Sequence, residues 1–369
     1  MEEKSREIKS GEMYWAWLCS APGLYARQID SLLARFKTPR QVYEAPDGAF
    51  DEWKQAGRVW VDPFLSYRRE HSPEWICHRL EKQGINFISR QAEGFPERLR
   101  QLPDCPGGLF FRGRLPQDER PAVAVVGARQ CSNYGRAAAR EISAALAEAG
   151  VQIVSGLALG IDGTAQRAAC DLGRDSYSVL GCGVDICYPR ENFSVYRNVM
   201  ELGGILSEFP PGAPPLSRHF PMRNRLISGL SDAVVVVEAR ERSGSLITAD
   251  LALEQGREVY AVPGRMTDRT SFGCNRLIEE GAGIVSSVET LLRSLNLEKR
   301  GGRKAEKEKL SLAPEEELVY SNLDLLPKGL EELAVKTALP LGRLAGILVR
   351  LQLSGLVTEV SKNQYARLK

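Results

Sequence analysis

Two stretches in the middle of the 369-residue chain constrain its fold more than any other part. Residues 122–135 and 154–162 each begin as an apolar run, change abruptly to glycine and small polar residues, and continue as an alanine-rich helical pattern. That order is typical of a buried parallel strand followed by a loop and the start of a helix. Two such units in succession predict a doubly wound sheet with a crevice at its strand ends. Backbone N–H groups and helix dipoles make such a crevice a site for anions, usually phosphate.

The central part of the chain, from about residue 121 to residue 294, continues this alternation of strands and alanine-rich helices. We predict seven strands in it: Val123–Val126, Gln152–Val154, Ser176–Leu180, Gly204–Ser207, Ala233–Val237, Glu258–Ala261 and Gly283–Val285. Leu109–Phe111 is predicted as a short edge strand that precedes them. Seven strands alternating with helices indicate an α/β layered fold that is larger than a minimal dinucleotide-binding domain.

Smaller units flank this central domain, which together with its lead-in spans residues 76–297. Residues 1–75 have a helical, amphipathic pattern and residues 298–310 form a charged linker. Residues 311–369 are predicted to form three helices and a two-stranded wing, which is the pattern of a winged helix. The N-terminal unit is interpreted either as a SAM-like or helix-hairpin-helix module that grips the DNA backbone, or as a small packing bundle. We favour the bundle because the hairpin lacks a clean Gly-x-Gly.

The composition argues against several classes of protein. Hydrophobic residues make up 43% and charged residues 26% of the chain, and the net charge is only +2, so any basic surface has to be local. The eight cysteines include no Cys-x-x-Cys pair and only three histidines exist, which argues against a zinc site and for reduced thiols. Because we find no signal peptide and no run of about 18 apolar residues, we expect a cytoplasmic protein without membrane contact.

Candidate phosphate-binding residues follow two of the predicted strands. Gly127 and Arg129 come after the first strand, where glycine permits close approach of the backbone and arginine offers a bidentate donor. Residues 242–249 follow the strand that ends at Val237, and they combine an arginine, small hydroxyl residues and a glycine at a helix start. Those are the groups that a phosphate-binding turn needs. The alternatives are an arginine paired with a carboxylate and an ordinary serine N-cap.

Residues 218–225 form the best basic patch of the chain, and Asn224 between two arginines suggests positioned donors rather than a solvated loop. Phe220 in this patch is a candidate surface for base stacking, although an aromatic residue there is more often part of a core. The charged or chargeable side chains of the patch are Arg218, His219, Arg223 and Arg225.

Two acidic residues lie in the segments that follow the second and third predicted strands. Asp162 is expected to cap the helix that follows it. Asp185, together with Tyr188, either hydrogen-bonds a base or ribose or fixes its own loop. Known catalytic signatures are missing: there is no P-loop, no Gly-x-Gly-x-x-Gly after the first strand, and no serine, histidine and acid set. We therefore predict neither ATP hydrolysis nor a cofactor.

Taken together, the strand-end motifs resemble the DNA-processing protein A family (DprA, also called Smf). The match covers nearly the whole chain and is strongest from Val125 to Ala282. The motifs that carry it are Val126–Arg129 with Ser132 and Tyr134–Gly135, Ser155–Asp162, Gly181–Gly183 with Tyr188–Pro189, Phe220–Arg225, Ser243–Ala249, Val262–Gly264, Ser271–Asn275 and Leu277–Ala282.

This resemblance implies an extended Rossmann-like domain, with a doubly wound and mostly parallel sheet, that binds single-stranded DNA without sequence specificity. It also implies that the protein forms a homodimer through that domain and is not an enzyme. The resemblance further implies that the protein loads a RecA-type recombinase onto single strands during natural transformation. The DNA-binding residues expected from the motifs are Gly127, Arg129, Ser132, Gly156, Arg223, Asn224, Arg225, Arg242, Ser243, Gly244, Ser245 and Thr248.

The chain departs from the family pattern at a few positions. The family often has lysine where Arg242 stands, which keeps the charge but changes its geometry. It usually has serine or threonine at Ala128, histidine at Gln166, and a Tyr–Pro pair where Phe95–Pro96 stands. None of these changes removes the basic groove.

Two rival functions stay open at this point. The first is a nucleotide-processing enzyme related to the nucleotide phosphoribohydrolases, although residues 238–245 lack the Pro-Gly-Gly-x-Gly-Thr loop of those enzymes. The second is a transcription regulator whose winged helix binds duplex DNA. From residue 311 onward seven basic and seven acidic residues cancel, so we favour a protein or inter-domain contact for the winged helix.

Overall fold

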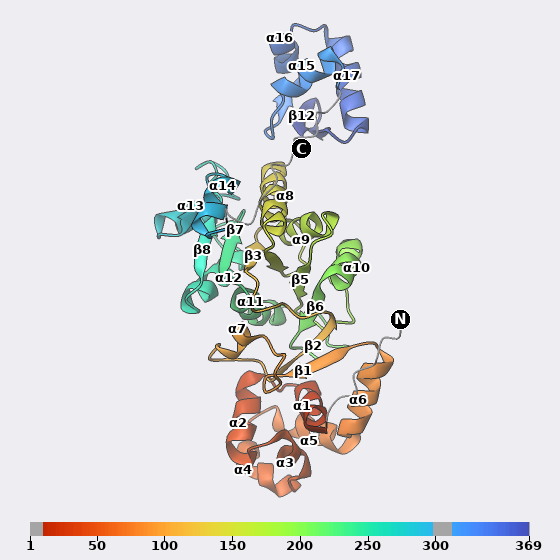
Figure 1. Ribbon diagram of the computed structural model, residues 1–369, viewed down its shortest axis with the longest axis vertical. Helices are drawn as coiled ribbons and strands as arrows, with labels where there is room; N and C mark the ends of the chain where they lie inside the picture. The colour runs from red at the N-terminus through yellow and green to blue at the C-terminus, as the bar shows by residue number, and fades with distance from the viewer. Residues whose placement is uncertain (1–9, 298–311, 369) are drawn as a thin grey trace.

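The computed structural model describes residues 10–297 and 312–368, and its centre is a nine-stranded sheet (Figure 1). The strand order is β1-β2-β6-β5-β4-β3-β7-β8-β9. Strands β3 to β9 are parallel to one another, whereas β2 runs antiparallel to both β6 and β1. The strands are β1 Asn86–Ser89, β2 Gly108–Gly113, β3 Ala122–Val126, β4 Gln152–Ser155, β5 Ser176–Val179, β6 Gly204–Ser207, β7 Ala233–Val236, β8 Glu258–Ala261 and β9 Gly283–Ile284.

The seven predicted strands are β3 to β9, and each observed end lies within one residue of its prediction, so this part of the fold is confirmed. The predicted edge strand corresponds to β2, but the prediction that it lies at the edge of the sheet is wrong. Residues Asn86–Ser89 pair with it on the side opposite β6, with Phe87 facing Phe110, so that β1 is the edge instead.

Helices cover both faces of the sheet, because successive residues of each strand point to opposite sides. Val123 and Val125 of β3 join one hydrophobic cluster, with α8, α9 and α14, whereas Ala124 and Val126 join another, with α11, α12 and α13. The helices of the central domain are α7 Glu97–Arg100, α8 Asn133–Glu148, α9 Ile161–Asp171, α10 Phe193–Leu202, α11 His219–Gly229, α12 Gly244–Glu254, α13 Phe272–Glu279 and α14 Val288–Ser294.

The N-terminal helices pack against the end of the sheet formed by β1 and β2 (Figure 1). Their core is continuous with the central domain, since Trp17 and Phe64 belong to the same buried cluster as Phe110 of β2. Helix α6 crosses the predicted boundary after residue 75, so the helical unit extends to Lys82. Its helices are α1 Ser10–Ser20, α2 Ala26–Phe36, α3 Pro39–Glu44, α4 Asp51–Gln55, α5 Val61–Glu70 and α6 Pro73–Lys82.

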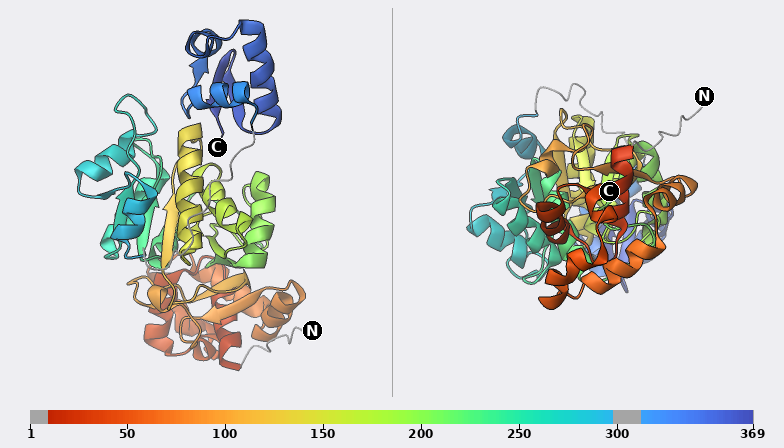
Figure 2. Two further views of the ribbon diagram at one scale, coloured as in Figure 1. Left: turned by 45° about the horizontal axis from the view of Figure 1, so that its top comes forward. Right: turned by 90° about the horizontal axis from the view of Figure 1, so that it is seen from below.

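The C-terminal unit lies at the other end of the molecule from the N-terminal helices (Figure 2). It has its own hydrophobic cluster and the element order of the predicted winged helix, whereas the predicted linker 298–310 is outside the described residues. Its elements are α15 Pro314–Asn322, β10 Lys328–Gly329, α16 Leu330–Thr337, α17 Leu341–Leu353, β11 Val357–Ser361 and β12 Gln364–Arg367, with strand order β10-β12-β11. Among the described helices none combines the length and the apolar character that a membrane crossing requires.

Candidate nucleic-acid interface

A groove of about 720 Å³ lies at the carboxyl ends of β3 and β7, where the winding of the sheet changes direction. Helices α9, α11 and α12 all begin at this groove, and a helix N-terminus carries a partial positive charge. The groove is therefore built to attract anions. Its lining includes nine of the predicted DNA-binding residues: Gly127, Arg129, Arg223, Asn224, Arg242, Ser243, Gly244, Ser245 and Thr248.

Arg129 follows the end of β3, is exposed to solvent, and lies over the ring of Phe220. Its guanidinium carbon lies 5.3 Å from the centre of the Phe220 ring. On Phe220 the ring of Tyr188 is stacked in turn, with 5.7 Å between centroids and 25° between planes. No carboxylate of residues 10–297 or 312–368 forms an ion pair with Arg129. The guanidinium is thus free for a phosphate, and the ring of Tyr188, which is 43% exposed and stacked on Phe220, offers a flat surface to a base.

The start of α12 supplies a second group of donors. Ser243 is its N-cap residue, and its Oγ accepts a hydrogen bond from the Ser245 N–H at 3.4 Å. The side-chain amide of Asn224 donates to the Gly244 carbonyl at 3.3 Å and so ties α11 to this turn. Arg242 precedes the turn and is exposed to solvent. A cation, two hydroxyls and a helix N-terminus together have the composition of a phosphate-binding turn.

Arg223 lies at the floor of the groove and holds the strand-end loops together. Its guanidinium donates to the carbonyl of Gly156 at 2.9 Å and to the carbonyl of Val179, the last residue of β5. A Cβ atom on Gly156 would lie 2.7 Å from this guanidinium, which explains the glycine. Burial lowers the pKa of Arg223 to about 10, so the side chain is still a cation at neutral pH. Gly156 lies behind Arg223 and does not line the groove.

The expectation that Arg225 lines the same groove is wrong. Its guanidinium pairs with Glu208 and, at 3.2 Å, with Asp104, and its side chain is 8% exposed. Side chains two residues apart on an α-helix are rotated by about 200° around its axis, so Arg223 and Arg225 point to opposite sides of α11. Arg225 therefore serves the packing of α11 and contributes no contact in the groove.

Ser132 also lies outside the groove, and it serves as the N-cap residue of α8. Its Oγ accepts from the Gly135 N–H at 3.0 Å and donates to a carboxylate oxygen of Glu238 at 2.5 Å. The N–H of Ser132 donates to the other oxygen of Glu238 at 2.8 Å. Both oxygens of Glu238 thus serve the N-terminus of α8.

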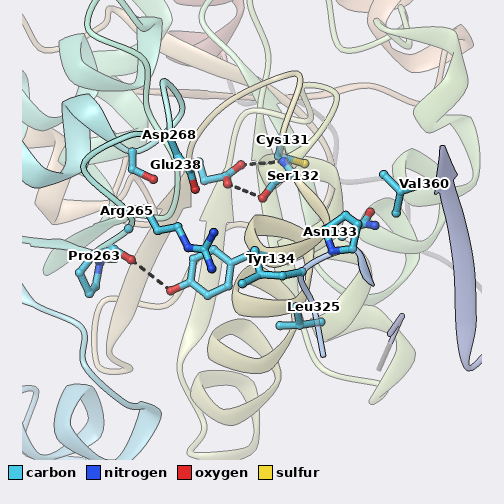
Figure 3. A pocket seen from close by; sticks show the side chains of 14 residues that line it. Cys131, Ser132, Asn133, Tyr134, Glu238, Pro263, Arg265, Asp268, Leu325 and Val360 are labelled. Atoms are coloured by element: carbon cyan, nitrogen blue, oxygen red, sulfur yellow. Dashed lines mark hydrogen bonds between the residues drawn. The ribbon is translucent and has the colours of Figure 1, made fainter. Parts of the chain in front are cut away.

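Ser132 and Glu238 line a second cavity, of about 610 Å³, which is formed by segments that follow β3, β7 and β8 and by the C-terminal unit (Figure 3). In it Tyr134 donates its hydroxyl to the Pro263 carbonyl at 3.1 Å, and Leu325 and Val360 of the C-terminal unit close one side. This lining is mostly apolar and carries one basic residue, Arg265, against two acidic ones, Glu238 and Asp268, so it is a poor match for a phosphate backbone.

Asp162 and Asp185 both stabilise loops of the protein. Helix α9 begins at Ile161 with Gly160 as its N-cap, so the prediction that Asp162 caps this helix is wrong. The carboxylate of Asp162 instead accepts from the Gly156 N–H at 3.0 Å across the loop, and burial raises its pKa. Asp185 accepts from the Gly212 N–H at 2.9 Å and fixes its loop, whereas Tyr188 lines the groove.

Arg240 and Gln130 line the groove and were missed by the sequence analysis. Their side chains are joined by a hydrogen bond of 3.4 Å. A signal for them exists in the register of the sheet, because Val126 of β3 faces Val236 of β7. Gln130 and Arg240 each follow their strand by four residues, so parallel pairing brings them to the same edge.

No group of three or more histidine, cysteine and acidic side chains in the described ranges is arranged to hold a metal ion. All eight cysteines are described, and each is a free thiol.

Comparison with known proteins gives matches along most of the chain. The DNA recombination-mediator protein A family model matches residues 86–296, which is more than half of the sequence. The chain is 45% identical over 233 residues to the protein Smf of Escherichia coli, an alignment that covers 63% of this chain and 62% of that relative. It is 29% identical over 394 residues to the protein Smf of Synechocystis, which covers 97% of this chain and 99% of that relative.

Two solved structures are similar as well. DNA processing protein A from Streptococcus pneumoniae superimposes with a TM-score of 0.65 and 36% identity, covering 78% of this chain and 98% of the other. DNA processing protein A from Helicobacter pylori, described for its single-stranded DNA binding mode, gives a TM-score of 0.52 with 29% identity, over 58% of this chain and 97% of the other. On these grounds the chain belongs to the DNA recombination-mediator protein A family.

Proposed function

We propose that this protein binds single-stranded DNA without sequence specificity in the groove between β3 and β7. The observation that carries the proposal is the series Arg129, Phe220 and Tyr188, in which a guanidinium without an ion-pair partner among the described residues lies over the ring of Phe220, and the ring of Tyr188 is stacked on Phe220. Arginine attracts the phosphate of any nucleotide, and an aromatic ring stacks with any base. Such a pair of contacts binds the strand without reading its sequence.

Single strands suit this groove better than a duplex. The exposed face of Tyr188, which ends the stack on Phe220, can stack only with bases that are not already stacked in a double helix. The α12 turn with Arg242, Ser243 and Ser245 supplies phosphate contacts beside them. The relative from Helicobacter pylori, described for its single-stranded DNA binding mode, supports the same ligand for this chain.

We further propose that the protein acts as a homodimer through its Rossmann-like domain and loads a RecA-type recombinase onto the bound strand during natural transformation. Support for this step comes from membership of a recombination-mediator family rather than from a contact in the structure. The test is the DNA-dependent ATPase of a RecA-type recombinase on single strands coated with a single-strand-binding protein. Faster onset when the protein is added supports loading, and an unchanged onset contradicts it.

DNA binding is tested by fluorescence anisotropy with a labelled oligo-dT, a mixed-sequence oligonucleotide of the same length, and its duplex. The proposal predicts similar affinity for the two single strands and weaker binding of the duplex. Equal binding of single strand and duplex, or a strong preference for one sequence, contradicts it.

The enzymatic alternative finds less support in the residues on which it depends. The phosphoribohydrolases that this alternative resembles use a catalytic glutamate, for which Glu238 is the candidate here. Such a carboxylate has to be open to substrate, whereas both oxygens of Glu238 accept hydrogen bonds from Ser132. The test is hydrolysis of nucleoside monophosphates by the wild type and by Glu238→Gln. We expect no turnover by either; turnover that Glu238→Gln abolishes would favour the enzyme.

A further inference from the structure

His219 and Phe220 are adjacent at the start of α11 but belong to different environments. Phe220 lines the groove, where it contacts Arg129 and Tyr188. His219 is 4% exposed and stacks on Phe209, with 4.1 Å between ring centroids and 18° between planes. One peptide bond thus joins the wall of the groove to a buried aromatic contact outside it.

The N-terminal helical domain reaches this contact through Tyr25. The hydroxyl of Tyr25 is hydrogen-bonded to Nε2 of His219 at 3.3 Å, between residues that are 194 positions apart in the sequence. Its ring also meets Phe209 edge-on, with 6.0 Å between centroids. Tyr25 is held in turn at the N-cap position of α2, where its backbone N–H donates to the Gln28 side chain at 3.2 Å. Tyr25 does not line the groove.

Phe220 and the backbone of His219 both lie close to Gly181, since a Cβ atom on that glycine would be 3.5 Å from the backbone carbonyl carbon of His219. A Cβ atom on Gly181 would lie 2.8 Å from Cδ1 of Phe220, so the ring packs directly on this backbone. Because side chains in a packed region shift together, the position of His219 influences that of Phe220.

We propose that Tyr25 is a positioning residue for the groove. Through Tyr25 the N-terminal domain fixes the position of His219, and through His219 the position of the Phe220 ring that lines the groove. This inference rests on the proposed binding of single-stranded DNA at Phe220. It gives the N-terminal domain a role in binding that requires no contact of its own with DNA.

The test compares two full-length variants that each remove one hydroxyl from the N-terminal domain. Tyr25→Phe removes the bond to His219 and keeps the ring. Tyr67→Phe is the matched control, since its hydroxyl donates at 2.9 Å to the carbonyl of Trp17, within the same domain. We expect Tyr25→Phe to weaken binding of labelled oligo-dT about threefold, the effect of one lost hydrogen bond. Tyr67→Phe should lower the unfolding temperature and leave the affinity unchanged.

A double-mutant cycle shows whether Tyr25 acts through Phe220. In the Phe220→Ala background, Tyr25→Phe should have no further effect on affinity. The salt dependence of binding should be the same in Tyr25→Phe as in the wild type, because no phosphate contact is lost. Equal affinities of Tyr25→Phe and Tyr67→Phe, or an undiminished effect of Tyr25→Phe without Phe220, would overturn the inference.

The two proposals fail in different ways. If Arg129→Ala and Phe220→Ala both leave oligo-dT binding intact, the groove is not the DNA site and both proposals are wrong. If those variants weaken binding and Tyr25→Phe does not, only the role of Tyr25 is refuted.

Discussion

Arg225 and Glu208 form a buried ion pair on the side of α11 that faces away from the groove, with side chains 8% and 5% exposed. Arg223, two residues earlier, lies at the floor of the groove with its guanidinium on two backbone carbonyls. One short helix therefore uses neighbouring arginines for different purposes, since one anchors the helix and the other organises the strand-end loops.

Arg225→Ala should destabilise the protein without weakening DNA binding by the folded fraction. Above pH 7, where Glu208 is ionised, removing its buried partner leaves that carboxylate without compensation, which costs about 3 kcal/mol or more. The measurement is urea unfolding, followed by anisotropy under conditions where the variant is folded. A variant with wild-type stability and weak DNA binding would show that Arg225 contacts DNA after all.

The unfolding free energy should depend on pH through Glu208. Burial outweighs the attraction of Arg225 and raises the pKa of Glu208 to about 7, from 4.5. Between these values the folded protein keeps a proton that the unfolded chain has released, so stability falls as the pH rises from about 4.5 to 7. The slope from this group is at most about 1.4 kcal/mol per pH unit.

Glu208→Gln cannot titrate and should flatten this part of the stability profile. Glu201→Gln, on the exposed end of α10, is the control and should keep the wild-type slope. Urea unfolding at several pH values provides both profiles, and identical slopes in all three proteins would contradict the assignment to Glu208.

Gly156→Ala should lower both stability and DNA affinity. The new Cβ would lie 2.7 Å from the Arg223 guanidinium, so Arg223 and the loop ends that it holds have to shift. Overpacking of this kind costs about 1–3 kcal/mol. Gly342→Ala, in α17 with no atom within 4 Å of the new Cβ, is the comparison and should not destabilise the protein. Wild-type behaviour of Gly156→Ala would mean that Arg223 is not held as described.

Arg343→Ala and Arg350→Ala together should leave duplex binding unchanged. These two basic residues of α17 pair with Glu315 and Glu316 of α15, so the helix offers no unpaired cation from them to a phosphate backbone. Exposed pairs of this kind contribute about 1 kcal/mol or less to stability. Anisotropy with a labelled duplex is the measurement, and a clear loss of binding would assign a DNA contact to the C-terminal unit.

The sequence predicted the parallel sheet well because its strands are buried on both faces and so appear as uninterrupted apolar runs, as in Ala122–Val126. It also predicted the groove at the ends of β3 and β7, because motifs that follow neighbouring parallel strands meet at one edge. Arg225 was misassigned because its place in a basic run was considered without the rotation of the helix that carries it.

Other features could not be predicted from local sequence. The pairing of Ser132 with Glu238 joins residues 106 positions apart, and only the fold brings them together. The same holds for Tyr25 and His219, which belong to different domains. Arg240, by contrast, could have been found by aligning β7 with β3 in register.

The central claim is that the groove arginines bind the phosphates of a single strand. Its most direct test is the salt dependence of oligo-dT affinity for the wild type, for Arg129→Ala with Arg242→Ala, and for Arg197→Ala as an exposed control on α10. The double variant should bind more weakly, and its slope of log affinity against log salt should be smaller by about 1.4, which is about 0.7 for each of two phosphate contacts to a single strand, while the control keeps both values. An unchanged affinity and slope in the double variant would place the DNA site elsewhere on the protein.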